Sequence, residues 1–141
     1  MNIEVNYVAV LVAGIVTMIV GFLWYGPMLF GNVWMKLMGH TKESIEKEKT
    51  NMGKTYGTSF VLALVTAYVL SHVMNLSQNF YHYEAVMTGV SSAFWMWLGF
   101  IMPVQATDVL FGNKKMKLFA INTGYQLASV LAMGVVLGLM K

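Results

Sequence analysis

Four long apolar runs, separated by short polar segments, dominate the hydrophobicity pattern of this chain. They cover residues 5–28, 55–75, 85–109 and 118–140, and each is almost free of charge. A helix of about 20 apolar residues crosses the roughly 30 Å hydrocarbon core of a bilayer. The pattern therefore predicts an all-α, multi-pass membrane protein with four transmembrane helices in a single domain, residues 1–141.

The composition supports this class and excludes several others. Hydrophobic residues make up 57% of the chain and charged residues 11%, unlike a soluble domain of this size. There is no cysteine, so disulfides and thiolate metal sites are excluded. The first run lacks a basic start and carries Glu4 instead, so we expect a retained helix rather than a signal peptide.

The lysines indicate an orientation. Eight of the nine lie in the segments after the first and third runs, namely Lys36, Lys42, Lys47, Lys49, Lys54, Lys114, Lys115 and Lys117. Short lysine-rich loops stay in the cytoplasm. We therefore expect both termini and the 77–83 loop outside. This topology accounts for the positive charge without a nucleic-acid partner, and the lipid bilayer is the expected partner.

An internal duplication organises the chain. Residues 29–37 read LFGNVWMKL and residues 110–118 read LFGNKKMKL, so all but two positions agree. The duplication predicts two parallel two-helix repeats, residues 1–76 and 84–141, related by a pseudo-two-fold axis along the membrane normal. An insertion, residues 39–53, separates the first copy from the second run. Its alternating charges indicate either a short surface helix capped by Thr41 or Ser44, or a polar linker.

Small residues at helical spacing indicate where the helices pack, because membrane helices associate through close backbone approach. Three such stripes occur: Ala13, Thr17 and Gly21; Ala63, Ala67 and Ser71; and Gly134 with Gly138. The last pair forms a GxxxG motif. It would serve either an internal seam or the face of a homo-oligomer, and the sequence leaves both open.

Several motifs also resemble a known family. The first group is Trp24-Tyr25-Gly26-Pro27, Leu29-Phe30-Gly31 and Trp34; the second is Trp97-Leu98-Gly99-Phe100, Pro103, Leu110-Phe111-Gly112, Leu118-Phe119, Ile121-Asn122, Gly124-Tyr125 and Met133-Gly134. Together they resemble the domain-of-unknown-function family 1761 over nearly the whole chain, with Gly26 where that family has serine. The resemblance implies four membrane spans in the cell (inner) membrane of a bacterium or archaeon, and it carries no established activity.

Polar residues inside the spans are the candidate site, because burying them in lipid is costly. Asp108 is the only acidic residue within a span and shares a helix face with Gln105, close to the helix-bending Pro103. Asn122 and Gln126 share a face of the fourth span. These four would line a ligand or ion pathway whose wall includes Trp95 or Trp97. The alternative is an ion pair of Asp108 with Lys114, Lys115 or Lys117, with the amides bonded between helices.

The chain's other polar residues give weaker hypotheses. Tyr68, His72, Asn75, His82 and Glu84 gather near the outer end but lack tight metal-ligand spacing. Ser91 and Ser92 with His72 would be the minimum for an intramembrane hydrolase. We assign no catalytic residue, metal or cofactor, and a non-enzyme is favoured. The expected function is binding or permeation of a small solute or ion; a membrane scaffold subunit and the hydrolase are the alternatives.

Overall fold

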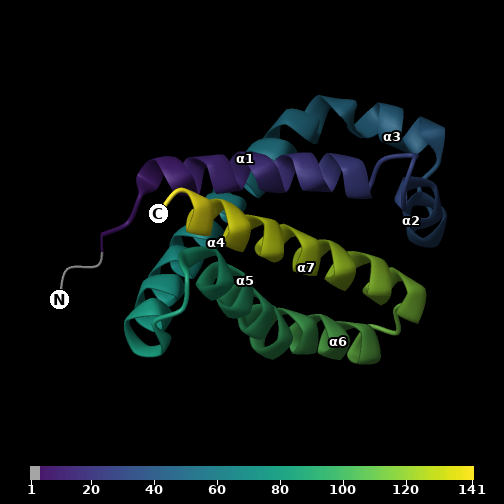
Figure 1. Cartoon of the computed structure of the whole chain (residues 1–141). Coiled ribbons are helices and arrows are strands. Elements are labelled where there is room, and N and C mark those ends of the chain that lie inside the picture. The colour runs from purple at the N-terminus through teal and green to yellow at the C-terminus, as the bar shows by residue number, and fades with distance from the viewer. Residues whose placement is uncertain (1–3) are drawn as a thin grey trace.

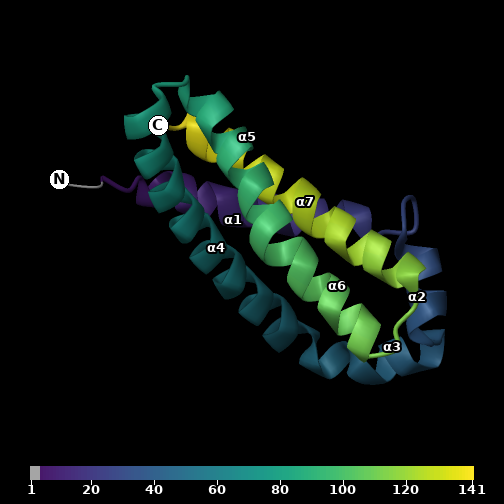
Figure 2. The ribbon, with the colours of Figure 1, turned by 90° about the horizontal axis from the view of Figure 1, so that it is seen from below.

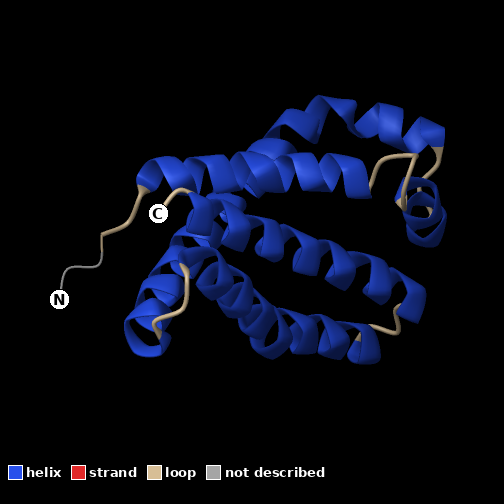
Figure 3. Cartoon of the chain, viewed as in Figure 1, coloured by secondary structure: helices blue, strands red, loops and turns tan. Residues whose placement is uncertain are grey.

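The computed structural model describes residues 4–141, and within them the chain is helical with no strand (Figures 1 and 3). Four helical segments are long and apolar enough to span a membrane. They are α1 (Tyr7–Trp24); Lys42–Tyr81, which ends in α4 (Met52–Tyr81); α5 (Ala85–Met96) with η2 (Trp97–Ile101) and α6 (Met102–Phe111); and α7 (Met116–Leu139). The all-α fold with four membrane-compatible helices is confirmed.

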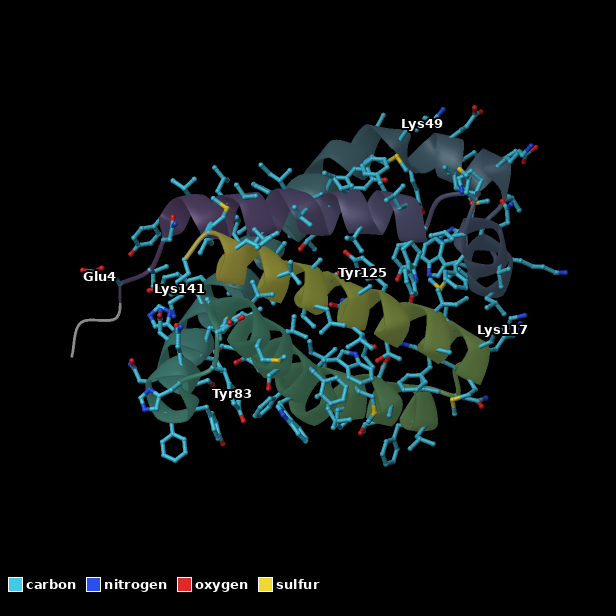
Figure 4. The ribbon with its side chains drawn as sticks, in the orientation of Figure 1. Glu4, Lys49, Tyr83, Lys117, Tyr125 and Lys141 are labelled. Carbon is cyan, nitrogen blue, oxygen red and sulfur yellow. The ribbon has the colours of Figure 1, made fainter. Side chains whose placement is uncertain are left out.

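Successive spans run in opposite directions, so the bundle has two distinct ends (Figures 1 and 2). The C-terminus and the α4–α5 connection lie at one end, near the start of α1, and we call this the terminal end. At the other, the lysine end, are α2 (Gly31–Met38), α3 (Lys42–Glu48), the 3-10 turn η1 (Lys49–Asn51) and the α6–α7 connection. Figure 4 shows Lys49 and Lys117 at the lysine end, and Glu4 and Lys141 at the opposite end.

The surface segment between α1 and α4 is helical, and this decides between the two expectations for residues 39–53. Thr41 is the N-cap of α3: its side chain accepts from the Ser44 backbone N–H, and the Ser44 side chain accepts from the Thr41 N–H. This reciprocal pair satisfies two otherwise free donors. No residue of α3 is buried, so the helix lies on the surface.

The two LFGN copies differ in local structure although both lie at the lysine end. In the first, Gly31 begins α2; in the second, Gly112 caps the end of α6. This difference arises from the residues that precede each copy. Gly26 and Pro27 follow the end of α1 at Trp24, whereas residues 107–109 continue α6. Both glycines permit a close backbone approach, because a Cβ would lie 2.3 Å from the Tyr25 oxygen at Gly31 and 2.5 Å from the Asp108 oxygen at Gly112. The pseudo-two-fold relation of the halves stays a prediction.

Glycine contacts hold α5 against α7. A Cβ on Gly89 would lie 2.1 Å from the Gly134 carbonyl oxygen, and a Cβ on Gly134 would lie 2.4 Å from that of Gly89. One turn further, a Cβ on Gly138 would lie 2.6 Å from the Val86 Cα. The GxxxG pair therefore forms a seam inside this chain. The other stripes also face inward, since Ala13 and Ala67 are completely buried.

The third span is interrupted near its middle by a π-helical turn. The Met102 N–H donates to the Trp97 carbonyl, five residues back, and Pro103 follows directly. Proline has no N–H and its ring crowds the preceding turn, so the widened turn accommodates it. The helix changes direction at this point (Figure 1), as Pro103 predicted.

Candidate functional site

Two tryptophans bind the backbone of α7 in its lysine-end half. The Trp24 Nε1–H donates to the Ile121 carbonyl at 3.0 Å, and the Trp97 Nε1–H donates to the Thr123 carbonyl at 3.0 Å. A buried indole needs such a partner. Thus α1 and the third span both attach to one short stretch of α7.

A tyrosine completes this attachment. The Tyr25 hydroxyl donates to Asn122 Oδ1 at 2.8 Å, and its ring packs against the Tyr125 ring with 5.1 Å between centroids. Gly124 makes room for the neighbouring indole, since a Cβ there would lie 3.1 Å from Trp24. We call Trp24, Tyr25 and Trp97, with residues 121–123, the α7 clamp. Its hydrogen bonds join α1 and the third span to α7, so it positions helices. The buried Thr123 Oγ1 has no hydrogen-bond partner within residues 4–141.

The predicted pathway residues have different surroundings in the structure. Asn122 belongs to the clamp, and Trp97 contacts α7 beside it. Gln105 is partly buried and its Oε1 has no hydrogen-bond partner within residues 4–141. Gln126 is also partly buried on α7. Trp95, by contrast, is 64% exposed on the outside of the bundle, so Trp97 is the tryptophan that faces inward.

Asp108 is exposed and forms an ion pair. Its side chain is 61% exposed and its carboxylate accepts from Lys114, as in the ion-pair alternative. An exposed pair of this kind contributes about 1 kcal/mol at most.

We therefore expect Asp108→Asn to lower the free energy of unfolding by no more than about 1 kcal/mol, measured by denaturant titration in detergent. Glu46→Gln is the matched control, because Glu46 and Lys49 form another exposed pair, at 3.7 Å. A loss of several kcal/mol for Asp108→Asn alone would contradict the surface role.

A second polar region lies at the terminal end, where a cavity of about 510 Å³ opens between α1, α4 and α7. Its polar lining is Glu4, Asn6, Ser71, Asn75, Gln78, Asn79 and Lys141. We call it the outer cavity. Sequence reasoning missed most of these residues, because they come from three distant segments. The signal in the sequence that could have indicated this cavity is the concentration of Asn and Gln residues where apolar runs end.

Hydrogen bonds hold the walls of the outer cavity together. The Asn6 side chain donates to the Met140 carbonyl at 2.8 Å, which joins the start of α1 to the end of α7. Lys141 donates to Gln78 Oε1 on α4. Partial burial lowers the pKa of Lys141 below its ordinary value, since leaving water disfavours the charged form. The cavity thus contains an ammonium that is incompletely solvated.

An apolar layer separates the outer cavity from the α7 clamp. Ala9, Ser71 and Leu137 line the cavity. One helical turn deeper, their helices carry Ala13, Ala67 and Met133, which are at most 2% exposed. Leu70 and Val130 join them in the core. The polar residues at the two ends are therefore not connected in this structure.

The residues of the weaker hypotheses make other contacts. His72 Nδ1 lies 3.0 Å from the Tyr68 carbonyl, and Ser92 Oγ lies 3.4 Å from Ser77 Oγ. His82 is exposed at the end of α4, with a left-handed φ of 56°. Within residues 4–141 no three His, Asp or Glu side chains are close enough to hold a metal ion. Within that part of the chain no hydrogen bond joins a serine to a histidine.

A family model matches residues 8–138, nearly the whole chain. No curated protein and no solved structure gives a match. The matched region includes α1 from residue 8 onward, the clamp and the glycine seam. The chain therefore belongs to the family described as protein of unknown function, DUF1761.

Proposed function

We propose that this membrane protein binds a small polar solute in the outer cavity. The observation that carries the proposal is the cavity itself, whose volume of about 510 Å³ lies within the range of small-molecule sites. Pockets of this size in soluble proteins are mostly apolar. This cavity instead contains amides and opposite charges, and it lies where a membrane helix bundle meets water. Such polarity favours a water-soluble ligand over a lipid chain.

The lining also restricts the solute's chemistry. Asn6, Asn75, Gln78 and Asn79 supply both donors and acceptors. Glu4 and Lys141 carry opposite charges, so the lining has no net charge. A neutral polyol or a zwitterion satisfies this set better than a simple anion or cation does.

Permeation of the same solute is the further step of this proposal. The lysine count supports an orientation with the outer cavity facing out of the cell (inner) membrane. The solute would then have to part the apolar layer at Ala13, Ala67 and Met133 to reach the amides Gln105, Asn122 and Gln126. Opening of this kind requires α7 to shift relative to α1, which the clamp resists.

Thiol labelling tests the cavity, and the absence of native cysteines makes single variants unambiguous. We expect Ser71→Cys to react in intact cells with a membrane-impermeant thiol reagent, because Ser71 lines the cavity. Ala67→Cys, one turn deeper and fully buried, should stay unreacted and is the matched control. Equal reaction at both positions would contradict a closed apolar layer. Reaction at position 71 only in inside-out vesicles would invert the orientation.

Solute protection then tests binding. Glycine as a zwitterion and glycerol as a neutral polyol are the probes, with sodium chloride as the ionic control. One of the two probes should slow labelling of Ser71→Cys severalfold and leave Phe80→Cys, exposed outside the cavity, unchanged. If neither changes the rate at position 71, the solute-binding proposal fails and a scaffold role is favoured.

A further inference from the structure

A second cavity, independent of the proposed function, lies on the side of the bundle between the end of α4 and α5. Its volume is about 480 Å³. Its hydroxyl lining is Ser77, Thr88, Ser91 and Ser92, and its aromatic walls include Tyr81, Tyr83, Trp95 and Phe100. No Asp, Glu, Lys or His within residues 4–141 lines it. We call it the lateral groove.

The aromatic walls face the surroundings of the bundle and not its core. Trp95 is 64% exposed, Phe100 74% and Tyr81 58%. On a helix that spans a membrane, such surfaces contact lipid. The lateral groove is therefore open to molecules that approach within the bilayer.

Two hydroxyls of the groove, those of Ser91 and Ser92, have spare hydrogen-bonding capacity. Thr88 returns its hydroxyl to its own helix, at the Glu84 carbonyl, as Thr17 does to Ala13. Ser92 instead meets only Ser77, at a long 3.4 Å. The hydrogen bonds within residues 4–141 leave the Ser91 hydroxyl without a partner. A polar group held in hydrocarbon without a partner is costly, and a bound ligand would remove that cost.

Depth and charge select the ligand class. With a rise of 1.5 Å per residue, Ser91 lies about 9 Å along α5 from its first residue, Ala85. A phosphate headgroup stays near the water interface and is bound by cationic side chains or backbone donors. Within residues 4–141 no cationic side chain lines the groove. An uncharged head with hydroxyl or carbonyl groups can reach this depth. The π-helical turn that carries Phe100 adjoins the groove, and such turns are frequent at functional sites.

We propose that the lateral groove binds one uncharged amphiphile from the bilayer. Its hydroxyl- or carbonyl-bearing head hydrogen-bonds Ser91 and Ser92, and its hydrocarbon tail lies against Trp95 and Phe100. Tyr81 and Tyr83 close the groove toward the terminal end.

Lipid binding to the purified full-length chain in detergent tests this proposal. The probes are dioleoylglycerol and dioleoyl phosphatidic acid, which share their chains and differ by the phosphate. We expect dioleoylglycerol to bind at least about tenfold more tightly, as measured by native mass spectrometry. Equal binding, or tighter binding of phosphatidic acid, would overturn the proposal.

Groove variants locate the bound lipid. Ser91→Leu should fill the groove and lower dioleoylglycerol affinity at least about tenfold, whereas Val65→Leu, on an exposed part of α4 outside the groove, should leave it unchanged. Ser91→Ala removes one hydroxyl without adding bulk, so it tests the hydrogen bond even if the leucine variant does not fold. Its affinity should fall about three- to tenfold. Wild-type affinity in Ser91→Ala would refute the assigned hydrogen bond and, with it, the proposal.

Discussion

Gly134→Ala is expected to destabilise the bundle by at least about 2 kcal/mol, because the added methyl group meets backbone that cannot move independently. The new Cβ would lie 2.4 Å from the Gly89 carbonyl oxygen and 3.2 Å from the Val90 nitrogen. Relief requires α5 and α7 to separate along their whole interface. Overpacking in a well-packed core costs about 1 to 3 kcal/mol, and a backbone clash lies at the upper end of that range.

Unfolding in detergent, followed by helix content and by size-exclusion elution, measures this effect. Gly57→Ala is the matched control, since it makes the same substitution within a helix and nothing lies within 4 Å of the new Cβ. There the higher helix propensity of alanine should stabilise α4 by up to about 1 kcal/mol. Similar changes in the two variants would show that α5 and α7 do not pack through Gly89 and Gly134.

Trp24→Ala is the second large effect, with an expected loss of about 3 to 5 kcal/mol. The indole fills the space above Gly124, contacts the Phe30 ring with 4.8 Å between centroids, and donates to the Ile121 carbonyl. Its removal leaves a cavity between α1 and α7. Trp24→Phe keeps most of the volume and loses only the hydrogen bond, so about 1 kcal/mol is expected.

Trp95→Ala is the control for this series, because the same side chain is removed from an exposed position. In lipid-free detergent its free energy of unfolding should change by less than about 1 kcal/mol. Denaturant titration of the three variants gives the comparison. If Trp24→Ala and Trp95→Ala cost the same, the clamp does not hold α1 to α7.

The sequence by itself determined the spans, their number and the charge asymmetry of the bundle. Transfer of apolar side chains into lipid is favourable residue by residue, so a run of about 20 such residues predicts a spanning helix without knowledge of its neighbours. The capping of α3 was also predictable, because the Thr41–Ser44 pair lies within one turn. Helix ends were predicted less well. Hydropathy shows where a helix is apolar, and α4 continues in both directions through polar residues.

Only the tertiary structure decided which polar residues meet. Gln105 and Asp108 lie one turn apart, yet one carries a buried oxygen and the other is exposed, because packing against α7 determines which part of the face is covered. The π-helical turn adds a residue before them, so helical periodicity counted from Trp97 misplaces everything that follows. Trp95 and Trp97 are about 200° apart on a helix, so one had to face outward, and packing selected Trp95.

For the same reason, the sequence could not predict the hydrogen bond between Tyr25 and Asn122, and it could not predict the outer cavity. Both bring together groups from distant parts of the chain, such as the Asn6 side chain and the Met140 backbone carbonyl. Their proximity depends on the crossing of α1 with α7, which the glycine and alanine seams set through close backbone contact. Local sequence therefore determined the helices, whereas the packing of those helices decided which polar side chains come together.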